Sequence, residues 1–161
     1  NADPAVMEFF PKALSEEEES NAMAARIKDR IEREGWGLWA VERKDSGEFI
    51  GFTGLSVPVA DLPFMPCVEI GWRLAKEHWG NGFATEAARA VLRFAFDELK
   101  LAEVVSFTAA TNLRSQAVMR RIGMSNTGAD FEHPNVPPGS SLRRHVLFKA
   151  LNLPNSGSEN F

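Results

Sequence analysis

One short stretch, Trp79-Gly80-Asn81-Gly82-Phe83-Ala84, constrains the fold of this chain more than any other part of it. It follows an alternating apolar run over residues 67–76 and precedes a run with helical spacing over residues 84–99. Glycines let the backbone approach a ligand closely, and the helix N-terminus behind them presents unpaired N–H groups and a positive dipole. Together these features predict a phosphate-binding turn that needs no lysine. Asn-Gly is also typical of a hairpin turn, but a hairpin requires a second strand, so the anion site is favoured.

The segments around this turn predict a βαβ unit. In the strand over residues 67–76, Ile70 and Trp72 share one face, whereas Glu69 and Arg73 share the other. The helix over residues 84–99 carries an apolar stripe rich in alanine, which favours close packing on a sheet. The β-branched run over residues 103–111 predicts a second strand, and the two strands should lie side by side and parallel.

The rest of the chain predicts an α+β fold with one mixed sheet. Asp3-Pro4 would cap a short helix through Phe10, and the S-x-x-E pattern from Ser15 to Glu18 would open a second helix that ends at Gly35. The remaining elements are expected to be a hairpin, a short helix and two final strands, over residues 37–57, 115–122, 124–131 and 142–150.

Composition excludes several classes of function. The chain has 161 residues, enough for one domain over residues 1–151 with a flexible tail over 152–161. Its net charge of −4 provides no general attraction to nucleic acid, so we expect no nucleic-acid partner. No apolar run reaches membrane-spanning length, and no signal peptide is visible. Cys67 is the single cysteine, so an internal disulfide is impossible and a reducing, cytoplasmic location is expected.

The histidines do not have a metal-binding arrangement in the sequence. His78, His133 and His145 lack the spacing to one another and to Cys67 that a metal site requires, so we predict no metal. We interpret His145 as a solvated or edge position of the last strand. His133 precedes a proline in a loop, where it could contact a substrate.

Two segments resemble the GNAT N-acetyltransferases. The run Glu69-Ile70-Gly71-Trp72-Arg73-Leu74 followed by Trp79 to Ala87 resembles the acetyl-CoA signature of that family, and the run from Thr111 to Met124 resembles its N-x-x-[SA]…G-[FM] segment. Both look most like the branch that acetylates the N-terminal amines of ribosomal proteins. The resemblance implies a mixed sheet with a central, splayed pair of parallel strands flanked by helices. The family normally begins with a strand before the first helix, and this chain starts at that helix. Either the sequence is a fragment, or the sheet edge near residues 38–43 is open and would invite pairing with a second copy in a homodimer.

The resemblance also implies acetyl-CoA as cosubstrate and an amine as acceptor. Pantetheine would lie between the splayed strands, against the backbone near Trp72 and Leu74 and beside Asn112. A neutral amine would attack the acetyl carbonyl directly, with positioning and electrostatic stabilisation supplying most of the rate. The CoA pyrophosphate would be held by the backbone N–H groups of Gly80, Asn81, Gly82, Phe83, Ala84 and Thr85.

An acid is wanted to protonate the departing thiolate. Many GNAT enzymes use a tyrosine for this step, but the matching position here is Met119 and the chain has no tyrosine. Ser115, one helical turn earlier, is the best substitute. Its alternative interpretation is a helix N-cap. Thiolate is also a good leaving group, so a reaction without an acid stays open.

A base is wanted to take the proton of the ammonium group. Glu69 lies in the strand that would line the site, where a buried carboxylate is costly unless it has a partner. The functional interpretation is a base, acting directly or through water, and the structural one is an ion pair with Arg73. Trp36 and Trp39 could line the acceptor groove, but tryptophans near a hairpin are more typical of a core.

We therefore expect an acetyl-CoA-dependent N-acetyltransferase that acts on a primary amine. The resemblance favours the α-amine of a protein N-terminus as the acceptor. A small-molecule amine, or a CoA-binding module without catalysis, remains an alternative.

Overall fold

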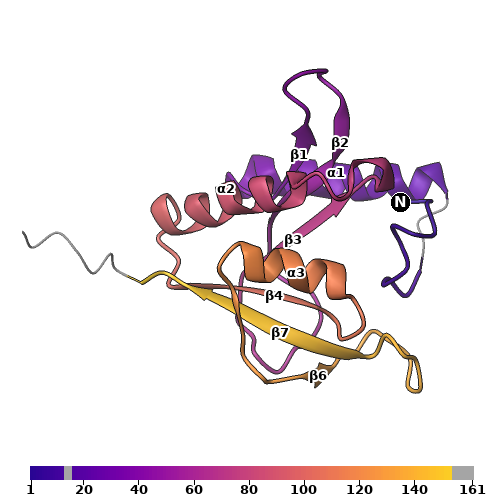
Figure 1. The fold of residues 1–161 in the computed structure, drawn as a ribbon, viewed down its shortest axis with the longest axis vertical. Helices are drawn as coiled ribbons and strands as arrows, with labels where there is room; N and C mark the ends of the chain where they lie inside the picture. Colours follow the sequence, from indigo (N-terminus) through magenta and orange to yellow (C-terminus); the bar gives the residue numbers. More distant parts are fainter. Residues whose placement is uncertain (13–15, 154–161) are drawn as a thin grey trace, which may run out of the picture.

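The computed structural model describes residues 1–12 and 16–153, so Ser15 of the predicted capping box and residues 154–161 of the predicted tail lie outside it. Its helices are α1 (Glu17–Glu34), α2 (Phe83–Asp97) and α3 (Leu113–Arg121), with a 3-10 turn, η1, at Lys76–His78. Its strands are β1 (Leu38–Glu42), β2 (Phe49–Ser56), β3 (Glu69–Leu74), β4 (Glu103–Ala109), β5 (Ser125–Asn126), β6 (Phe131–Glu132) and β7 (Arg144–Leu151) (Figure 1).

These strands form one mixed sheet, as the sequence predicted. Their order is β1-β2-β3-β4-β7-β5, with β6 also paired to β7. β3 and β4 run parallel, and the other neighbouring pairs are antiparallel. Because α2 connects β3 to β4, the predicted βαβ unit is confirmed.

The two parallel strands meet at one end only. Glu69 pairs with Val105, and the N–H of Val105 donates to the carbonyl of Val68 at 2.9 Å. Beyond this point the ladder stops, although β3 continues to Leu74 and β4 to Ala109. The pair is therefore splayed, with a gap that widens toward the carboxyl ends of both strands.

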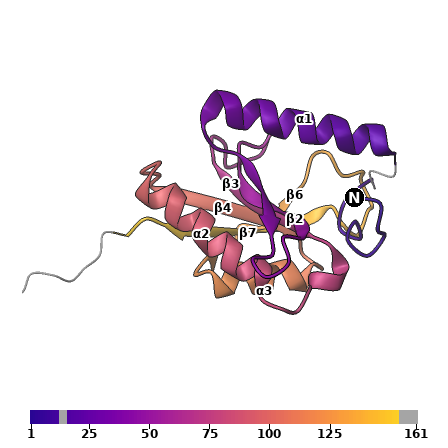
Figure 2. The same ribbon diagram turned by 90° about the horizontal axis from the view of Figure 1, so that it is seen from above.

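Helices cover both faces of the sheet. Figure 2 shows α1 on one side and α2 with α3 on the other. Ala88 and Ala95 of α2 are fully buried in one cluster with Ile70 of β3 and Phe148 of β7. Their small side chains let the helix backbone lie close to the sheet, which sets the height of the turn before α2 above β3.

Helix α1 packs less deeply against the sheet than α2 does. Its half-buried apolar residues are Met23, Ile27 and Ile31, at the predicted spacing, and no residue of the helix is fully buried. Gly35 ends the helix in a left-handed conformation, and its N–H donates to the carbonyl of Ile31 at 2.9 Å. The predicted end of this helix is thus confirmed.

Two predicted elements are wrong. Asp3 does accept hydrogen bonds from the N–H groups of Ala5 and Val6, but the residues that follow form turns instead of a helix. A capped first turn with few residues to extend it does not repay the cost of helix nucleation. The predicted strand over residues 124–131 is two separate two-residue strands, β5 and β6, on the same edge of β7.

None of the helices within residues 1–12 and 16–153 is both long enough and apolar enough to cross a bilayer.

A close backbone approach fixes how β1 lies against β2. A Cβ at Gly54 would lie 2.0 Å from the carbonyl oxygen of Gly37 and 2.7 Å from Cα of Leu38. A Cβ at Gly71, the partner of Gly54 across the β2–β3 pair, would meet no atom within 4 Å. A methyl group would therefore clash with the backbone at Gly54 but not at Gly71.

We expect Gly54→Ala to lower the free energy of unfolding by at least about 2 kcal/mol, because backbone atoms must move to admit the methyl group. Gly71→Ala is the matched control and should change it by less than about 1 kcal/mol. Denaturant unfolding of both variants measures the difference. Equal effects would contradict the packing described for β1 and β2.

Candidate active site

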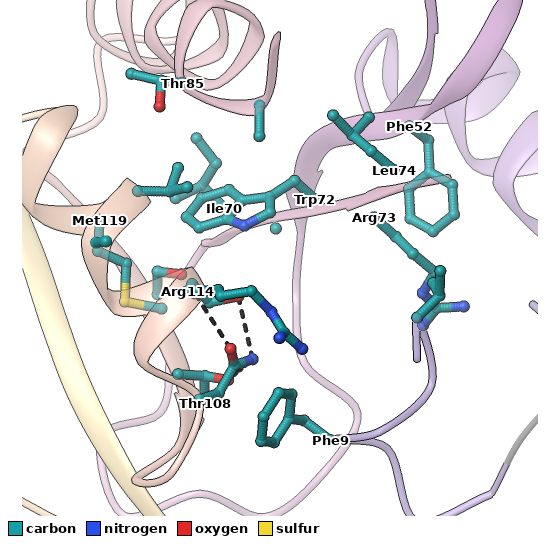
Figure 3. A pocket seen from close by; sticks show the side chains of 18 of the residues that line it. Phe9, Phe52, Ile70, Trp72, Arg73, Leu74, Thr85, Thr108, Arg114 and Met119 are labelled. Atoms are coloured by element: carbon teal, nitrogen blue, oxygen red, sulfur yellow. Dashed lines mark hydrogen bonds between the residues drawn. The ribbon is translucent and has the colours of Figure 1, made fainter. Parts of the chain in front are cut away.

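One cavity of about 1370 Å³ follows the gap between β3 and β4. Figure 3 shows Trp72 in its middle, between Thr85 and Met119 on one side and Arg73 with Phe52 on the other. All the residues that the sequence predicted for the site line this one cavity: Glu69, Trp72, Leu74, Gly80, Asn81, Gly82, Phe83, Ala84, Thr85, Asn112 and Ser115.

The turn before α2 presents a row of free N–H groups. Gly80 and Gly82 have φ of 79° and 83°, a conformation that disfavours other residues, and a Cβ at either would meet no protein atom within 4 Å. The first helical hydrogen bond runs from the N–H of Glu86 to the carbonyl of Gly82. Within the described residues, no acceptor is found for the backbone N–H groups of residues 80–85. Such a row at a helix N-terminus is an anion site.

Side chains hold the turn in place. The amide of Asn81 donates to the carbonyls of His78 and Trp79 at 3.3 and 3.1 Å. The indole N–H of Trp79 donates to the carbonyl of Leu74 at 2.9 Å, which ties the turn to the end of β3. Arg89, Arg93 and Arg121 also line the cavity and add positive charge to this region. The sequence analysis did not single out these three arginines.

The backbone of β3 points into the gap. The N–H of Ala75 donates to the carbonyl of Ile50 on β2, at 2.9 Å. Because successive residues of a strand direct their N–H groups to opposite sides, those of Trp72 and Leu74 point away from β2, toward β4. The splay leaves them without the strand partner that Val105 provides for Val68.

Asn112 and Ser115 form a hydrogen-bonded unit at the start of α3. Asn112, and not Ser115, is the N-cap: its Oδ1 accepts from the N–H of Ser115 at 3.2 Å. The N-cap interpretation of Ser115 is thus wrong. The amide of Asn112 also donates to Thr108 Oγ1 at 3.0 Å and to Ser115 Oγ at 3.1 Å. Because Ser115 Oγ accepts from this amide, its own hydroxyl proton is free to be donated into the cavity.

Glu69 lies at the closed end of the gap. Ser56, its partner across β2 and β3, places a hydroxyl group near its carboxyl group, which favours the charged form. Removal from water has the larger effect and raises the pKa of Glu69 from 4.5 to about 8. The carboxyl group is therefore mostly protonated at pH 7 and becomes a carboxylate in mildly basic solution.

The predicted ion pair between Glu69 and Arg73 is absent. Residues four apart in a strand share a face but lie about 13 Å from each other along it, too far for contact. Arg73 instead stacks on Phe10 at 4.1 Å and Phe52 at 5.3 Å, and its Nη1 donates to Asn1 Oδ1 at 2.7 Å. Glu69 is left with no cationic partner among the described ion pairs.

His145 is neither solvated nor on an edge, so that interpretation is also wrong. It is 8% exposed and lies between Ala109 of β4 and Phe131 of β6. Its side chain and that of His133 line the cavity. The two-residue strand β6, which covers this part of β7, was not visible in the sequence pattern.

Trp36 and Trp39 pack against the core and do not line the cavity, which confirms their structural interpretation. Within the described parts of the chain, no three His, Cys, Asp or Glu residues come together as a metal-ligand group.

Residues 1–125 match the acetyltransferase (GNAT) domain. The chain belongs to the GNAT acetyltransferase family. GNAT enzymes are acyl-CoA N-acyltransferases, which transfer an acetyl group from acetyl-CoA to an amine. The fold and family expected from the two motifs are thereby confirmed.

The names of individual relatives give different activities. The FsC-acetyl coenzyme A-N(2)-transacetylase of Aspergillus fumigatus is 33% identical over 84% of this chain, which spans 60% of that protein. A GNAT-family acetyltransferase from Bacillus anthracis has a TM-score of 0.75 at 24% identity, covering 94% of this chain and 84% of that one. The ribosomal-protein-S5-alanine acetyltransferase from Vibrio fischeri has a TM-score of 0.69 at 17% identity, over 88% and 77% of the two chains. The two structures share the fold.

The cavity fits acetyl-CoA, the cosubstrate of this family. Free N–H groups and arginines at one end suit its phosphates. The unpaired backbone of β3 suits the amide groups of pantetheine, and the gap leads to Glu69. Along the cavity, groups that suit phosphates are thus followed by groups that suit pantetheine, which is the order of these two parts in acetyl-CoA.

The raised pKa of Glu69 predicts how stability depends on pH. Between about pH 4.5 and 8 the unfolded chain ionises this carboxyl group and the folded chain does not, so ionisation favours unfolding. Relative to Glu69→Gln, the wild-type protein should lose up to about 1.4 kcal/mol of unfolding free energy per pH unit across this window. Denaturant unfolding of both proteins from pH 5 to 9 measures it. Parallel stability profiles would show that Glu69 has an ordinary pKa.

Proposed function

We propose that this protein acetylates the α-amine of a protein N-terminus, by direct attack of the amine on acetyl-CoA bound in the gap between β3 and β4. The observation that carries the proposal is the gap itself. It joins an anion-binding turn at one end to a desolvated carboxyl group at the other, and both line one cavity.

Bound acetyl-CoA would supply an activated thioester. The N–H groups of residues 80–85 would hold its pyrophosphate, and those of Trp72 and Leu74 would bind pantetheine and the thioester carbonyl. Asn112 would contact pantetheine from the side of α3, through the second lone pair of its Oδ1, because both its amide hydrogens are already donated within the protein.

Glu69 is proposed as the base. An amine is a nucleophile only after losing its proton, and a carboxylate whose pKa is near 8 accepts a proton more readily than an ordinary carboxylate does. Ser56 places a hydroxyl group near the carboxyl group without supplying a positive charge that would lower its basicity. The proton would pass from the ammonium group to Glu69, directly or through one water molecule.

Ser115 is proposed as the acid. Its hydroxyl proton has no acceptor among the described hydrogen bonds, whereas its oxygen accepts from Asn112 at 3.1 Å. Donation of that proton would convert the departing thiolate to a thiol. Met119, at the position where many GNAT enzymes have tyrosine, cannot do so.

Two observations support a protein N-terminus as acceptor. The motifs resemble the branch that acts on ribosomal proteins, and an enzyme named for such a substrate shares the fold. The cavity also extends from Glu69, at the closed end of the gap, to His133 and His145 near the carboxyl end of β4, which leaves length for an extended chain. A second candidate is a small amine, because the 33% identical fungal relative is named for acetylation at an N(2) atom of FsC.

The proposal is tested by mixing the protein with acetyl-CoA and a panel of amines and measuring free thiol. Peptides with a free α-amine should release thiol, and the same peptides with a blocked α-amine should not. Release with spermidine or amino acids alone would favour the small-molecule alternative. Tight CoA binding without thiol release on any amine would show a CoA-binding module instead.

Gly82→Val should weaken CoA binding about a hundredfold, because the side chain would occupy the space that the pyrophosphate needs and displace charge-assisted hydrogen bonds. Gly47→Val is the matched control: Gly47 also has a positive φ, of 70°, and open space, but lies outside the cavity. Its CoA affinity should stay within about twofold of wild type. Titration calorimetry compares the two, and equal affinities would rule out the turn as the phosphate site.

Ser115→Ala should lower kcat about a hundredfold if this hydroxyl protonates the thiolate. Ser115→Thr keeps a hydroxyl group at the same position and should retain most of the turnover. Steady-state kinetics with saturating acetyl-CoA measures both variants. Unchanged turnover in Ser115→Ala would remove Ser115 from the mechanism.

A further inference from the structure

The proposed reaction leaves two histidines of the cavity without a role. His145 lies in β7, and His133 follows β6, which pairs with β7. Their ring centroids are 4.8 Å apart. Both line the same cavity as Glu69. They therefore form a pair on the wall of the site.

This pair lies on the same face of the sheet as Glu69. Glu69 is paired with Val105, and His145 is paired with Ala109. Val105 and Ala109 are four residues apart in β4, so their side chains point to the same face. The pair is therefore displaced from Glu69 by about 13 Å along the strand direction, toward the carboxyl end of β4, and by two strand spacings of about 4.8 Å across the sheet. The two displacements combine to about 16 Å.

Hydrogen bonds made by Nδ1 fix the tautomer of each ring. Nδ1 of His145 lies 3.1 Å from the carbonyl oxygen of Arg143, which can only accept, so Nδ1 carries the hydrogen and Nε2 a lone pair. Nδ1 of His133 accepts from the N–H of Asn135 at 3.2 Å, so in the neutral ring the hydrogen is on Nε2. The pair thus offers one N–H donor and one acceptor.

The surroundings favour an uncharged partner. Phe107 and Phe131 pack around both imidazoles, with ring centroids 5.6 to 6.3 Å from them. Burial lowers the pKa of both histidines, so the rings are neutral near pH 7. A neutral donor and a neutral acceptor between apolar rings match the backbone of one residue of an extended chain, whose N–H and C=O point to the same side.

We propose that His133 and His145 bind the backbone of one acceptor residue, about four to five residues from its α-amine. The distance follows from the displacement of about 16 Å, because an extended chain covers about 3.3 to 3.6 Å per residue. The acceptor C=O would accept from Nε2 of His133, and an acceptor N–H would donate to Nε2 of His145. This inference rests on the proposed function, since it requires a peptide acceptor.

The test is a series of alanine peptides with a free α-amine and an amidated C-terminus. In the wild-type protein, kcat/KM should rise about tenfold from the dipeptide to the hexapeptide, mainly through KM, because two hydrogen bonds are gained. In the double variant His133→Phe/His145→Phe, the ratio of hexapeptide to dipeptide should fall to about one. Phe64→Leu is the control: Phe64 packs on Phe107 and Phe131 but does not line the cavity, so the ratio should be kept.

If the double variant does not fold, His133→Phe alone, at a half-buried loop position, should lower the ratio to about threefold through loss of one hydrogen bond. A flat series in the wild-type protein, or full length dependence in the variants, would overturn the histidine subsite and leave the proposed function intact. Wild-type protein that acetylates small amines but no peptide of any length would overturn both.

Discussion

Strands β3 and β4 are joined where Glu69 meets Val105, and they separate from there. A splayed pair leaves backbone groups without strand partners, which is costly unless water or a ligand satisfies them. The separation is tolerated because each strand has a complete antiparallel neighbour on its other side, β2 for β3 and β7 for β4. The cavity, the exposed amides of β3 and the position of the turn before α2 all depend on this one interrupted ladder.

The same interruption sets the electrostatics of the site. Positive potential gathers at the open end, where α2 begins and the arginines line the cavity. At the closed end, removal from water raises the pKa of Glu69. In the proposed reaction, the anionic cosubstrate would bind at one end of the gap and Glu69 would accept a proton at the other. This separation is what a direct transfer from a thioester to an amine requires.

The features that could be predicted from the sequence are local ones. The turn at Gly80 and Gly82, the helix after it and the parallel strands on either side follow from periodicity and glycine placement over about forty residues. The positions of Asn112 and Ser115 at the start of α3 follow from the motif. Local pattern gave a wrong prediction at Asp3 to Phe10, where a good cap is not followed by a helix, and over residues 124–131, where one predicted strand is two short ones.

The features that could not be predicted depend on pairing between distant segments. Ser56 reaches Glu69 only because of the β2–β3 register, and His145 is buried only because β6 covers β7. The expected pair of Glu69 with Arg73 failed because a shared strand face does not imply contact at four residues' separation. Cross-strand register is set by packing of the whole sheet, so single-segment patterns do not contain it.

The most direct test of this account is a crystal structure with a covalent conjugate of CoA and an N-terminal peptide. It should show the pyrophosphate oxygens within hydrogen-bonding distance of the N–H groups of residues 80–85. The sulfur should lie between β3 and β4, and the peptide nitrogen should face Glu69. A conjugate whose pyrophosphate lies away from this turn, or whose sulfur lies outside the gap, would contradict the account.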